Sequence, residues 1–380
     1  MQMRIPLSSP DVSEPEIEAV VSVLRGRTLS QGPKIVEFEK MISDFVGTQF
    51  AVAVNTGTSG LHLCIRALNL KSGDEVITSP FSFIASANVM LYERASPVFV
   101  DIDPVTLNID PAKIEAAITD RTRALMIVHV FGRPAPMDEI KSIALKHGLK
   151  IIEDACEALG AETRGRMAGS IGEAGVFAFY PNKQITTGEG GAIVTDSEDI
   201  RDRVIQLRNH GRDPRSEWFE HVELGYNYRI SDINCALGVE QLRRIDEILT
   251  LREGVATRYG EMLRDNSDLI LPNMEFEGGR ISWFVYVVLL KADFRRAQRD
   301  WVIEQLKAEG IGCGRYFAPI HLQPLYKRLF GYIEGDFPIA EDVADRAIAL
   351  PFFNRLTETQ QWEVCSRLTN VVRRARTEAA

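Results

Sequence analysis

The chain has 380 residues, of which 45% are hydrophobic and 26% charged, and its formal net charge is −9 at pH 7. This length allows two or three domains with a large buried core, and the composition is ordinary for a soluble globular protein. The acidic balance argues against nucleic acid as the main partner. No apolar stretch approaches membrane-spanning length, so we expect no membrane partner.

The cysteines and histidines lack the spacing that disulfide frameworks and metal sites need. The five cysteines form no C-x-x-C pair, and the six histidines form no H-E-x-x-H or similar ligand pattern. We therefore expect reduced thiols and no metal. Residues 1–10 contain no apolar region of a signal peptide, which favours a cytoplasmic protein.

Short apolar runs alternate with helix-length segments between residues 50 and 195, and the helical segments include residues 60–68 and 137–147. The runs are rich in Val and Ile and apolar on both faces, as buried parallel strands are. This alternation predicts an α/β domain in which helices cover a mostly parallel sheet, and ligands of such sheets bind at the carboxyl ends of the strands. The predicted strands are Ala51–Val54, Glu75–Thr78, Pro97–Val100, Ala124–Val128, Lys150–Ile152, Val176–Phe179 and Ala192–Val194.

Lys183 lies just past one of these predicted strands. Between Lys150 and Lys291 it is the one lysine, whereas arginine occurs fourteen times, and it precedes the glycine-rich segment Gly188–Gly191. Unlike arginine, lysine can lose its proton and attack a carbonyl. A surface loop is the more common place for a single lysine, but the four segments described next favour imine chemistry.

Two of these segments suit a flat cofactor that carries a phosphate. Residues 55–60, Asn-Thr-Gly-Thr-Ser-Gly, separate a strand from a helix, where backbone N–H groups cradle a phosphate. Alone, such a turn is more often an ordinary helix cap. Residues 79–85, Ser-Pro-Phe-Ser-Phe-Ile-Ala, follow the next strand, and an aromatic side chain there can stack on a flat ring, although core packing is its commoner role.

The other two segments carry charged side chains. Asp154 ends a buried strand, where a carboxylate is costly unless it is paired with a cation such as a protonated pyridine nitrogen. A helix N-cap is the alternative role of this aspartate. Residues 225–232, Gly-Tyr-Asn-Tyr-Arg-Ile-Ser-Asp, place an asparagine and an arginine before a helix, where they suit phosphate or sugar contacts. A capped helix start explains the same residues.

After Ser231 the pattern changes. Residues 232–263 predict one or two long helices with an apolar stripe, residues 283–290 a strong strand, and residues 298–309 a helix that ends at Gly310. We expect a large α/β domain with an N-terminal arm over residues 1–249 and a smaller α+β domain over residues 250–380.

Together these motifs resemble those of the DegT/StrS-type sugar aminotransferases. The resemblance rests on the order Asn-Thr-Gly-Thr-Ser, Glu-Asp-Ala-Cys-Glu-Ala-Leu-Gly-Ala, Phe-Tyr-Pro-Asn-Lys…Thr-Gly-Glu-Gly-Gly and Gly-Tyr-Asn-Tyr-Arg-Ile-Ser-Asp. It extends from Leu29 to Pro351 and so covers nearly the whole chain. It implies the aspartate-aminotransferase fold, that is, fold type I, and pyridoxal 5'-phosphate as the cofactor.

The resemblance also implies roles for individual residues. Lys183 is the Schiff-base lysine, which later moves a proton between the cofactor and the sugar carbon. Asp154 pairs with the pyridine nitrogen, and Phe83 stacks on the ring. By the same resemblance, the phosphate cup is formed by Gly57, Thr58 and Ser59, and Glu157 lies near the ring hydroxyl. Asn227 is implied to contact the phosphate from the neighbouring subunit, and Arg229 and His321 are implied to line the sugar-nucleotide site.

The sequence departs from the family at Ala178. Five residues before the lysine, the family usually has a serine that contacts the phosphate, and this chain lacks that hydroxyl. We therefore expect the phosphate to depend more on Thr58, Ser59 and Asn227.

The implied function is transfer of an amino group from L-glutamate to a nucleotide-linked keto sugar, in a homodimer with shared active sites. Residues 182–191 are similar to the corresponding segment of GDP-perosamine synthases, which favours a 4-keto-6-deoxy sugar. One alternative is a pyridoxal-phosphate sugar dehydratase of the same fold, in which histidine replaces the lysine. A non-catalytic regulatory protein of this fold is another, whereas a nucleotide-binding oxidoreductase would need a G-x-G-x-x-G motif that is missing after the first strand.

Overall fold

A seven-stranded sheet is the centre of the molecule in the computed structural model, which describes residues 3–213, 220–276 and 278–378. The strand order is β1-β9-β8-β5-β4-β2-β3, and β9 is antiparallel to both its neighbours while the other pairs are parallel. The predicted mostly parallel sheet and all seven predicted strands are confirmed. Their bounds are β1 Phe50–Val54, β2 Glu75–Thr78, β3 Ser96–Phe99, β4 Thr122–Val128, β5 Lys150–Asp154, β8 Ala174–Ala178 and β9 Gly191–Thr195.

Helices cover both faces of this sheet, which explains why its strands are apolar on both sides. Val52 and Val54 of β1 pack in one cluster with α3, α4 and α7, whereas Ala53 between them packs in another with α2 and α8. Helix α6 covers the far half of this second face. The bounds are α2 Pro33–Val46, α3 Gly57–Ala67, α4 Ala85–Tyr92, α6 Met137–His147, α7 Glu198–Arg208 and α8 Asp232–Arg243.

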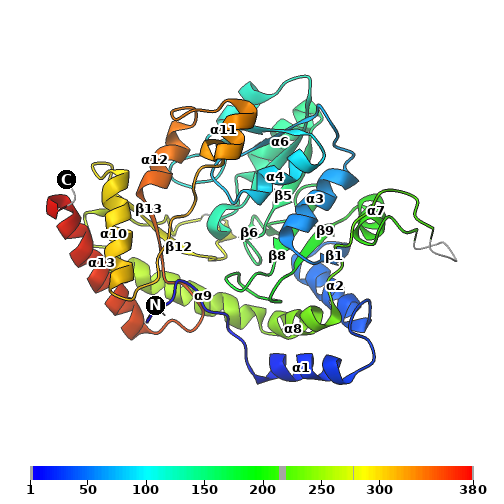
Figure 1. Cartoon of the computed structure of the whole chain (residues 1–380), viewed down its shortest axis with the longest axis horizontal. Coiled ribbons are helices and arrows are strands. Elements are labelled where there is room, and N and C mark those ends of the chain that lie inside the picture. The colour runs from blue at the N-terminus through cyan, green and yellow to red at the C-terminus, as the bar shows by residue number, and fades with distance from the viewer. Residues whose placement is uncertain (1–2, 214–219, 277, 379–380) are drawn as a thin grey trace.

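Several shorter elements lie outside the large sheet and the helices that cover it. Helix α1 packs against α8 and lies on the outside of the molecule in Figure 1. A small three-stranded sheet has the order β11-β6-β7. The bounds are α1 Glu14–Arg25, α5 Pro111–Ile114, β6 Glu162–Thr163, β7 Arg166–Met167 and β11 Gly279–Arg280, with 3₁₀ turns η1 Glu115–Ala117, η2 Val130–Gly132 and η3 Ile320–Leu322.

The C-terminal part of the chain has its own antiparallel sheet, of order β10-β12-β13, and its own apolar core. Helices α10 and α13 pack on each other there, to one side of the large sheet (Figure 1). Ile5 from the N-terminal end packs into the same core. The bounds are β10 Leu269–Ile270, α10 Arg296–Ala308, α11 Pro324–Phe330, α12 Pro338–Arg346, β12 Tyr286–Leu290, β13 Ala347–Leu350 and α13 Glu358–Glu378.

Helix α9 (Ile245–Leu263) connects the two cores. Leu249 packs with the elements of the large sheet, and Val255 packs with the C-terminal sheet. In Figure 1, α8 and α9 run along one side of the molecule from the large sheet to the C-terminal helices. The predicted boundary between residues 249 and 250 therefore falls inside a continuous helix, and the division into two domains stays a prediction.

Residues 286–290 of the strand predicted at residues 283–290 are confirmed as β12, whereas residues 283–285 are not strand. The carbonyls of Trp283 and Phe284 accept hydrogen bonds from the guanidinium of Arg252, at 2.6 and 2.7 Å. Arg252 is buried in α9. These two carbonyls therefore accept hydrogen bonds from a buried cation and not from a neighbouring strand. Within the described residues, no helix combines the length and apolar character needed to cross a membrane.

Candidate active site

One cavity of about 490 Å³ opens where β4, β5 and β8 end and α3 begins. Its volume lies in the range of roughly 300–1,000 Å³ that is usual for small-molecule sites. Its position at the carboxyl ends of parallel strands is the one that the sheet topology predicts. Six of the predicted site residues line it: Gly57, Thr58, Phe83, Asp154, Glu157 and Lys183.

The first turn of α3 forms one end of the cavity. Thr56 is the N-cap, and its hydroxyl accepts the N–H of Ser59 at 3.0 Å, while Gly57 and Thr58 line the cavity. A Cβ added at Gly57 would lie 2.7 Å from the Cβ of Ala178 and 2.9 Å from the Sγ of Cys156. The walls therefore approach so closely that a side chain at this position would force its neighbours to shift, which glycine avoids.

Ser59 does not line the cavity, in contrast to its predicted part in the phosphate cup. Its hydroxyl donates to Oδ1 of Asn55 at 2.7 Å and lies 2.9 Å from the hydroxyl of Thr56. The side chain is thus used to hold the turn that precedes α3. The hydroxyl that remains available at this end of the cavity is that of Thr58.

Asp154 ends β5 with a carboxylate that is 6% exposed. Its Oδ2 accepts a hydrogen bond from the hydroxyl of Ser86 at 2.6 Å, and its Oδ1 accepts the N–H of Cys156 at 3.2 Å. The preceding residue, Glu153, has its carboxylate 2.9 Å from Nε2 of His129, and neither of these two residues lines the cavity. Strand alternation therefore selects Asp154 as the carboxylate of the cavity.

Lys183 lines the cavity, with its side chain 13% exposed. Its Nζ is 3.7 Å from Oε1 of Glu157 and 3.9 Å from the ring centroid of Phe284. The other carboxylate oxygen of Glu157 accepts the N–H of Phe131 at 2.9 Å. Burial raises the pKa of Glu157, and the nearby charge of Lys183 opposes that rise.

These residues fit pyridoxal phosphate. The helix N-terminus suits the phosphate, the exposed ring of Phe83 is free to stack on a flat ring, and Lys183 and Asp154 line the same cavity. Asp154 and Glu157 are both buried, and the Lys183 ammonium lies beside Glu157, so a protonated pyridine nitrogen would supply a positive charge for Asp154. No cluster of His, Cys, Asp and Glu able to hold a metal ion occurs in the described part of the chain.

Besides Ser59, three predicted residues lie outside the cavity of the single chain. Asn227 is exposed, and Arg229 donates to Oδ1 of Asn209 at 2.7 Å beside a separate pocket. His321 is fully buried, and its Nε2 lies 2.9 Å from Oε1 of Glu341. In this chain His321 therefore helps to hold the turn before α12 through Glu341, and its predicted part in the sugar-nucleotide site stays a prediction.

The sequence reasoning missed the wall that comes from the C-terminal part. Phe284, Tyr316 and Phe317 line the cavity although they lie at least 100 residues after Lys183. Their sequence signal is an apolar run, which is equally typical of core packing. Nearer to Lys183, the cavity is also lined by Cys156, Tyr180, Asn182 and Glu189.

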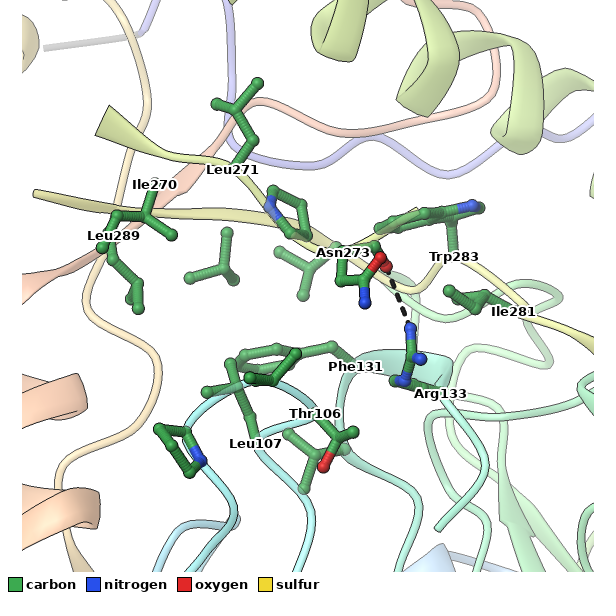
Figure 2. A pocket seen from close by; sticks show the side chains of 16 residues that line it. Thr106, Leu107, Phe131, Arg133, Ile270, Leu271, Asn273, Ile281, Trp283 and Leu289 are labelled. Carbon is green, nitrogen blue, oxygen red and sulfur yellow. Dashed lines mark hydrogen bonds between the residues drawn. The ribbon is translucent and has the colours of Figure 1, made fainter. Parts of the chain in front are cut away.

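A second cavity, of about 170 Å³, lies behind the first. Phe131 lines it and stacks on Phe317 of the first cavity, with ring centroids 5.4 Å apart. Figure 2 shows Phe131 and Leu107 facing Ile270 and Leu289 across it. The described residues that line this second cavity are mainly apolar. The candidate active site is therefore the first cavity, which contains Lys183 and Asp154.

Comparisons with known proteins agree with this geometry. Residues 10–369 match the model of the DegT/DnrJ/EryC1/StrS aminotransferase family. The chain is 41% identical over 372 residues to the GDP-perosamine synthase of Caulobacter vibrioides, covering 97% of this chain and 98% of the relative. The structure matches PseC of Helicobacter pylori, an aminotransferase involved in the biosynthesis of pseudoaminic acid, with a TM-score of 0.93 and 28% identity, covering 98% and 100% of the chains.

It also matches the PLP form of Spr1654 from Streptococcus pneumoniae, with a TM-score of 0.93 and 28% identity, covering 98% of this chain and 99% of the other. The extent of the family match and the identity over nearly the full length establish the family. The chain therefore belongs to the DegT/DnrJ/EryC1/StrS aminotransferase family, and it is a sugar aminotransferase that depends on pyridoxal phosphate.

Proposed function

We propose that the protein transfers an amino group from L-glutamate to the keto carbon of a nucleotide-linked 4-keto-6-deoxy sugar. The observation that carries this proposal is the placement of Lys183 in one cavity with Asp154 and the first turn of α3. The amine, the carboxylate and the helix N-terminus are the three groups that a pyridoxal-phosphate transaminase needs.

Each of these residues has a task that its position supports. When bound, pyridoxal phosphate supplies an aldehyde that accepts nitrogen and a protonated ring that withdraws electrons. Lys183 provides the nucleophilic amine and later holds or moves a proton at Nζ. Asp154 would pair with the protonated ring nitrogen and so balance its charge, and Oε1 of Glu157 lies 3.7 Å from Nζ of Lys183. Tyr316, Phe317 and Phe284 cover the cavity and exclude water.

The substrate proposal rests on the relatives. The similarity of residues 182–191 to GDP-perosamine synthases, together with 41% identity to such a synthase, supports a 4-keto-6-deoxy sugar carried by a nucleotide. L-Glutamate is proposed as the donor from the family resemblance. The proposal predicts that 2-oxoglutarate forms in equal amount to the amino sugar.

We further propose that two subunits share each active site. Asn227 is exposed, whereas the rings of its neighbours Tyr226 and Tyr228 stack on each other with centroids 4.9 Å apart and lie against His62. The two tyrosines therefore anchor the segment while leaving Asn227 free for a contact outside its own chain. A two-fold dimer would bring Asn227 of each chain to the phosphate of the other.

Activity is tested by incubating the cofactor-loaded protein with glutamate and a panel of nucleotide-linked keto sugars, and measuring 2-oxoglutarate and the amino sugar. Borohydride treatment of the loaded protein should label the Lys183 peptide and no other. The Lys183→Ala variant is the matched control and should give neither label nor product. A label on another lysine contradicts the assigned role of Lys183, and a dehydrated keto sugar without 2-oxoglutarate supports the dehydratase alternative.

The shared site is tested by mixing two inactive variants, Lys183→Ala and Asn227→Ala. Random pairing of equal populations makes half of the dimers mixed, and each mixed dimer has one intact site, so about a quarter of wild-type activity should return. As a matched control, Lys183→Ala is mixed with Asp154→Asn, two lesions within one chain's cavity, and this mixture should stay inactive. If mixed dimers form and the first mixture also stays inactive, Asn227 serves its own chain.

A further inference from the structure

Ser86 is a buried residue that the proposed mechanism has not yet used. It lies in the first turn of α4, is 0% exposed, and has its hydroxyl 2.6 Å from Oδ2 of Asp154. The neighbouring α4 residues Ala85, Ala87 and Val89 are buried and apolar. A buried hydroxyl in such surroundings is costly unless it is hydrogen-bonded, and here the acceptor is the carboxylate of the cavity.

The direction of this hydrogen bond follows from the groups involved. An ionised carboxylate only accepts, so the single proton of the Ser86 hydroxyl is donated to Asp154. The hydroxyl of Ser82 lies 2.8 Å from that of Ser86 and is then the donor of the pair. Ser82 lines the cavity, so a chain of two hydroxyls leads from the cavity wall to the side of Asp154 that faces α4.

Ser86 also fixes the turn that carries Phe83. Its backbone N–H donates to the carbonyl of Phe83 at 3.2 Å, and its hydroxyl is 3.1 Å from the same oxygen. One residue thus contacts both the proposed stacking aromatic and the proposed partner of the ring nitrogen. Because the hydroxyl proton goes to Asp154, it is the backbone N–H of Ser86 that holds the turn of Phe83.

We propose that Ser86 is a positioning residue that orients the Asp154 carboxylate towards the ring nitrogen and stabilises its negative charge. Charge-assisted hydrogen bonds are the strong ones, and a second donor, the Cys156 N–H, holds the other oxygen. With both oxygens held, the carboxylate keeps one rotamer and keeps the ring nitrogen protonated. This proposal rests on the proposed function, in which Asp154 pairs with that nitrogen.

The test uses full-length protein loaded with ¹⁵N-labelled pyridoxal phosphate, because the ¹⁵N chemical shift reports directly whether the ring nitrogen is protonated. Ser86→Ala should move the resonance towards that of an unprotonated pyridine. It should lower kcat about 10- to 100-fold, as expected for a lost hydrogen bond to a charged group, with KM for the donor changed less than kcat. Ser86→Thr keeps a hydroxyl and should retain the wild-type resonance.

Two variants serve as controls. Ser82→Ala keeps the Ser86 donor and should shift the resonance less than Ser86→Ala does. Ser43→Ala removes another buried helix hydroxyl, one that bonds only to the carbonyl of Lys40 among the described residues, and it should leave the resonance unchanged.

The outcomes separate this proposal from the function on which it rests. If the wild-type ring nitrogen is unprotonated, the role of Asp154 fails and the role of Ser86 fails with it. If the wild-type nitrogen is protonated and Ser86→Ala keeps the same resonance and kcat, the inference about Ser86 alone is wrong. A Ser86→Ala protein that only loses thermal stability, with an unchanged resonance in its loaded fraction, likewise reduces Ser86 to a structural residue.

Discussion

Gly57→Ala tests whether the close approach of α3 to β8 sets the affinity for the cofactor phosphate. The added Cβ would lie 2.7 Å from the Cβ of Ala178 and 2.9 Å from the Sγ of Cys156. Carbon atoms in good contact are roughly 3.5–4.0 Å apart, so the first distance is short by about 1 Å. Over-packing of this kind costs about 1–3 kcal/mol, and if the strain falls on the phosphate cup the Kd for pyridoxal phosphate should rise about 5- to 160-fold.

The assay is an absorbance titration of the cofactor-free protein with pyridoxal phosphate, with circular dichroism to check the fold. Ala178→Gly removes the nearest clashing atom, so the double variant Gly57→Ala/Ala178→Gly should recover a large part of the lost affinity. This coupling is the interaction energy of a double-mutant cycle. Gly254→Ala is the matched control, because its nearest obstacle is the flexible end of Arg258, 3.3 Å away, and its cofactor affinity should not change.

Two results would refute the reasoning. An unchanged Kd in Gly57→Ala would show that the cup expands without cost. An equal loss in the single and double variants would show that the contact with Ala178 does not cause the effect.

Three further predictions concern the floor and walls of the cavity. Asp154→Asn should keep the fold and the borohydride label but lower turnover by orders of magnitude, because the neutral amide cannot hold the ring nitrogen protonated; near-normal turnover in a steady-state assay contradicts this role. Ala178→Ser should add a hydrogen bond of about 1.5–3 kcal/mol to the phosphate and slow cofactor loss on dialysis, and unchanged loss would mean that the phosphate is already saturated or that the serine is misplaced. In the cofactor-free state, Glu157→Gln should have the same melting temperature as the wild type below pH 4.5 and a higher one above pH 4.5. Burial raises the pKa of Glu157 from 4.5, so the wild type loses stability as the pH rises through the folded pKa, and the neutral amide does not. A melting-temperature gap that shrinks with rising pH contradicts the sign.

Some features of the site could be predicted from the sequence because they are local. Asp154 ends the buried strand β5, and Lys183 lies five residues after the buried strand β8, so the apolar runs beside them are enough to place both near strand ends. Gly57 and Thr58 are part of a strand–turn–helix segment that can be recognised without its surroundings. Ser59 lies in the same segment, but its hydroxyl bonds to Asn55 and does not line the cavity. The direction of this hydroxyl depends on local side-chain geometry, which a sequence pattern does not specify.

The sequence by itself predicted the seven strands of the large sheet, several of the helices that cover it and the positions of Lys183 and Asp154 near strand ends, because periodicity and strand ends are properties of short segments. Tertiary structure decided what surrounds them. It brought Phe284 and Tyr316 from the C-terminal part over Lys183, placed Ser86 against Asp154, and buried His321 away from the cavity. These contacts join segments that are tens to more than a hundred residues apart, and their geometry comes from the packing of one element on another, which a single sequence does not display.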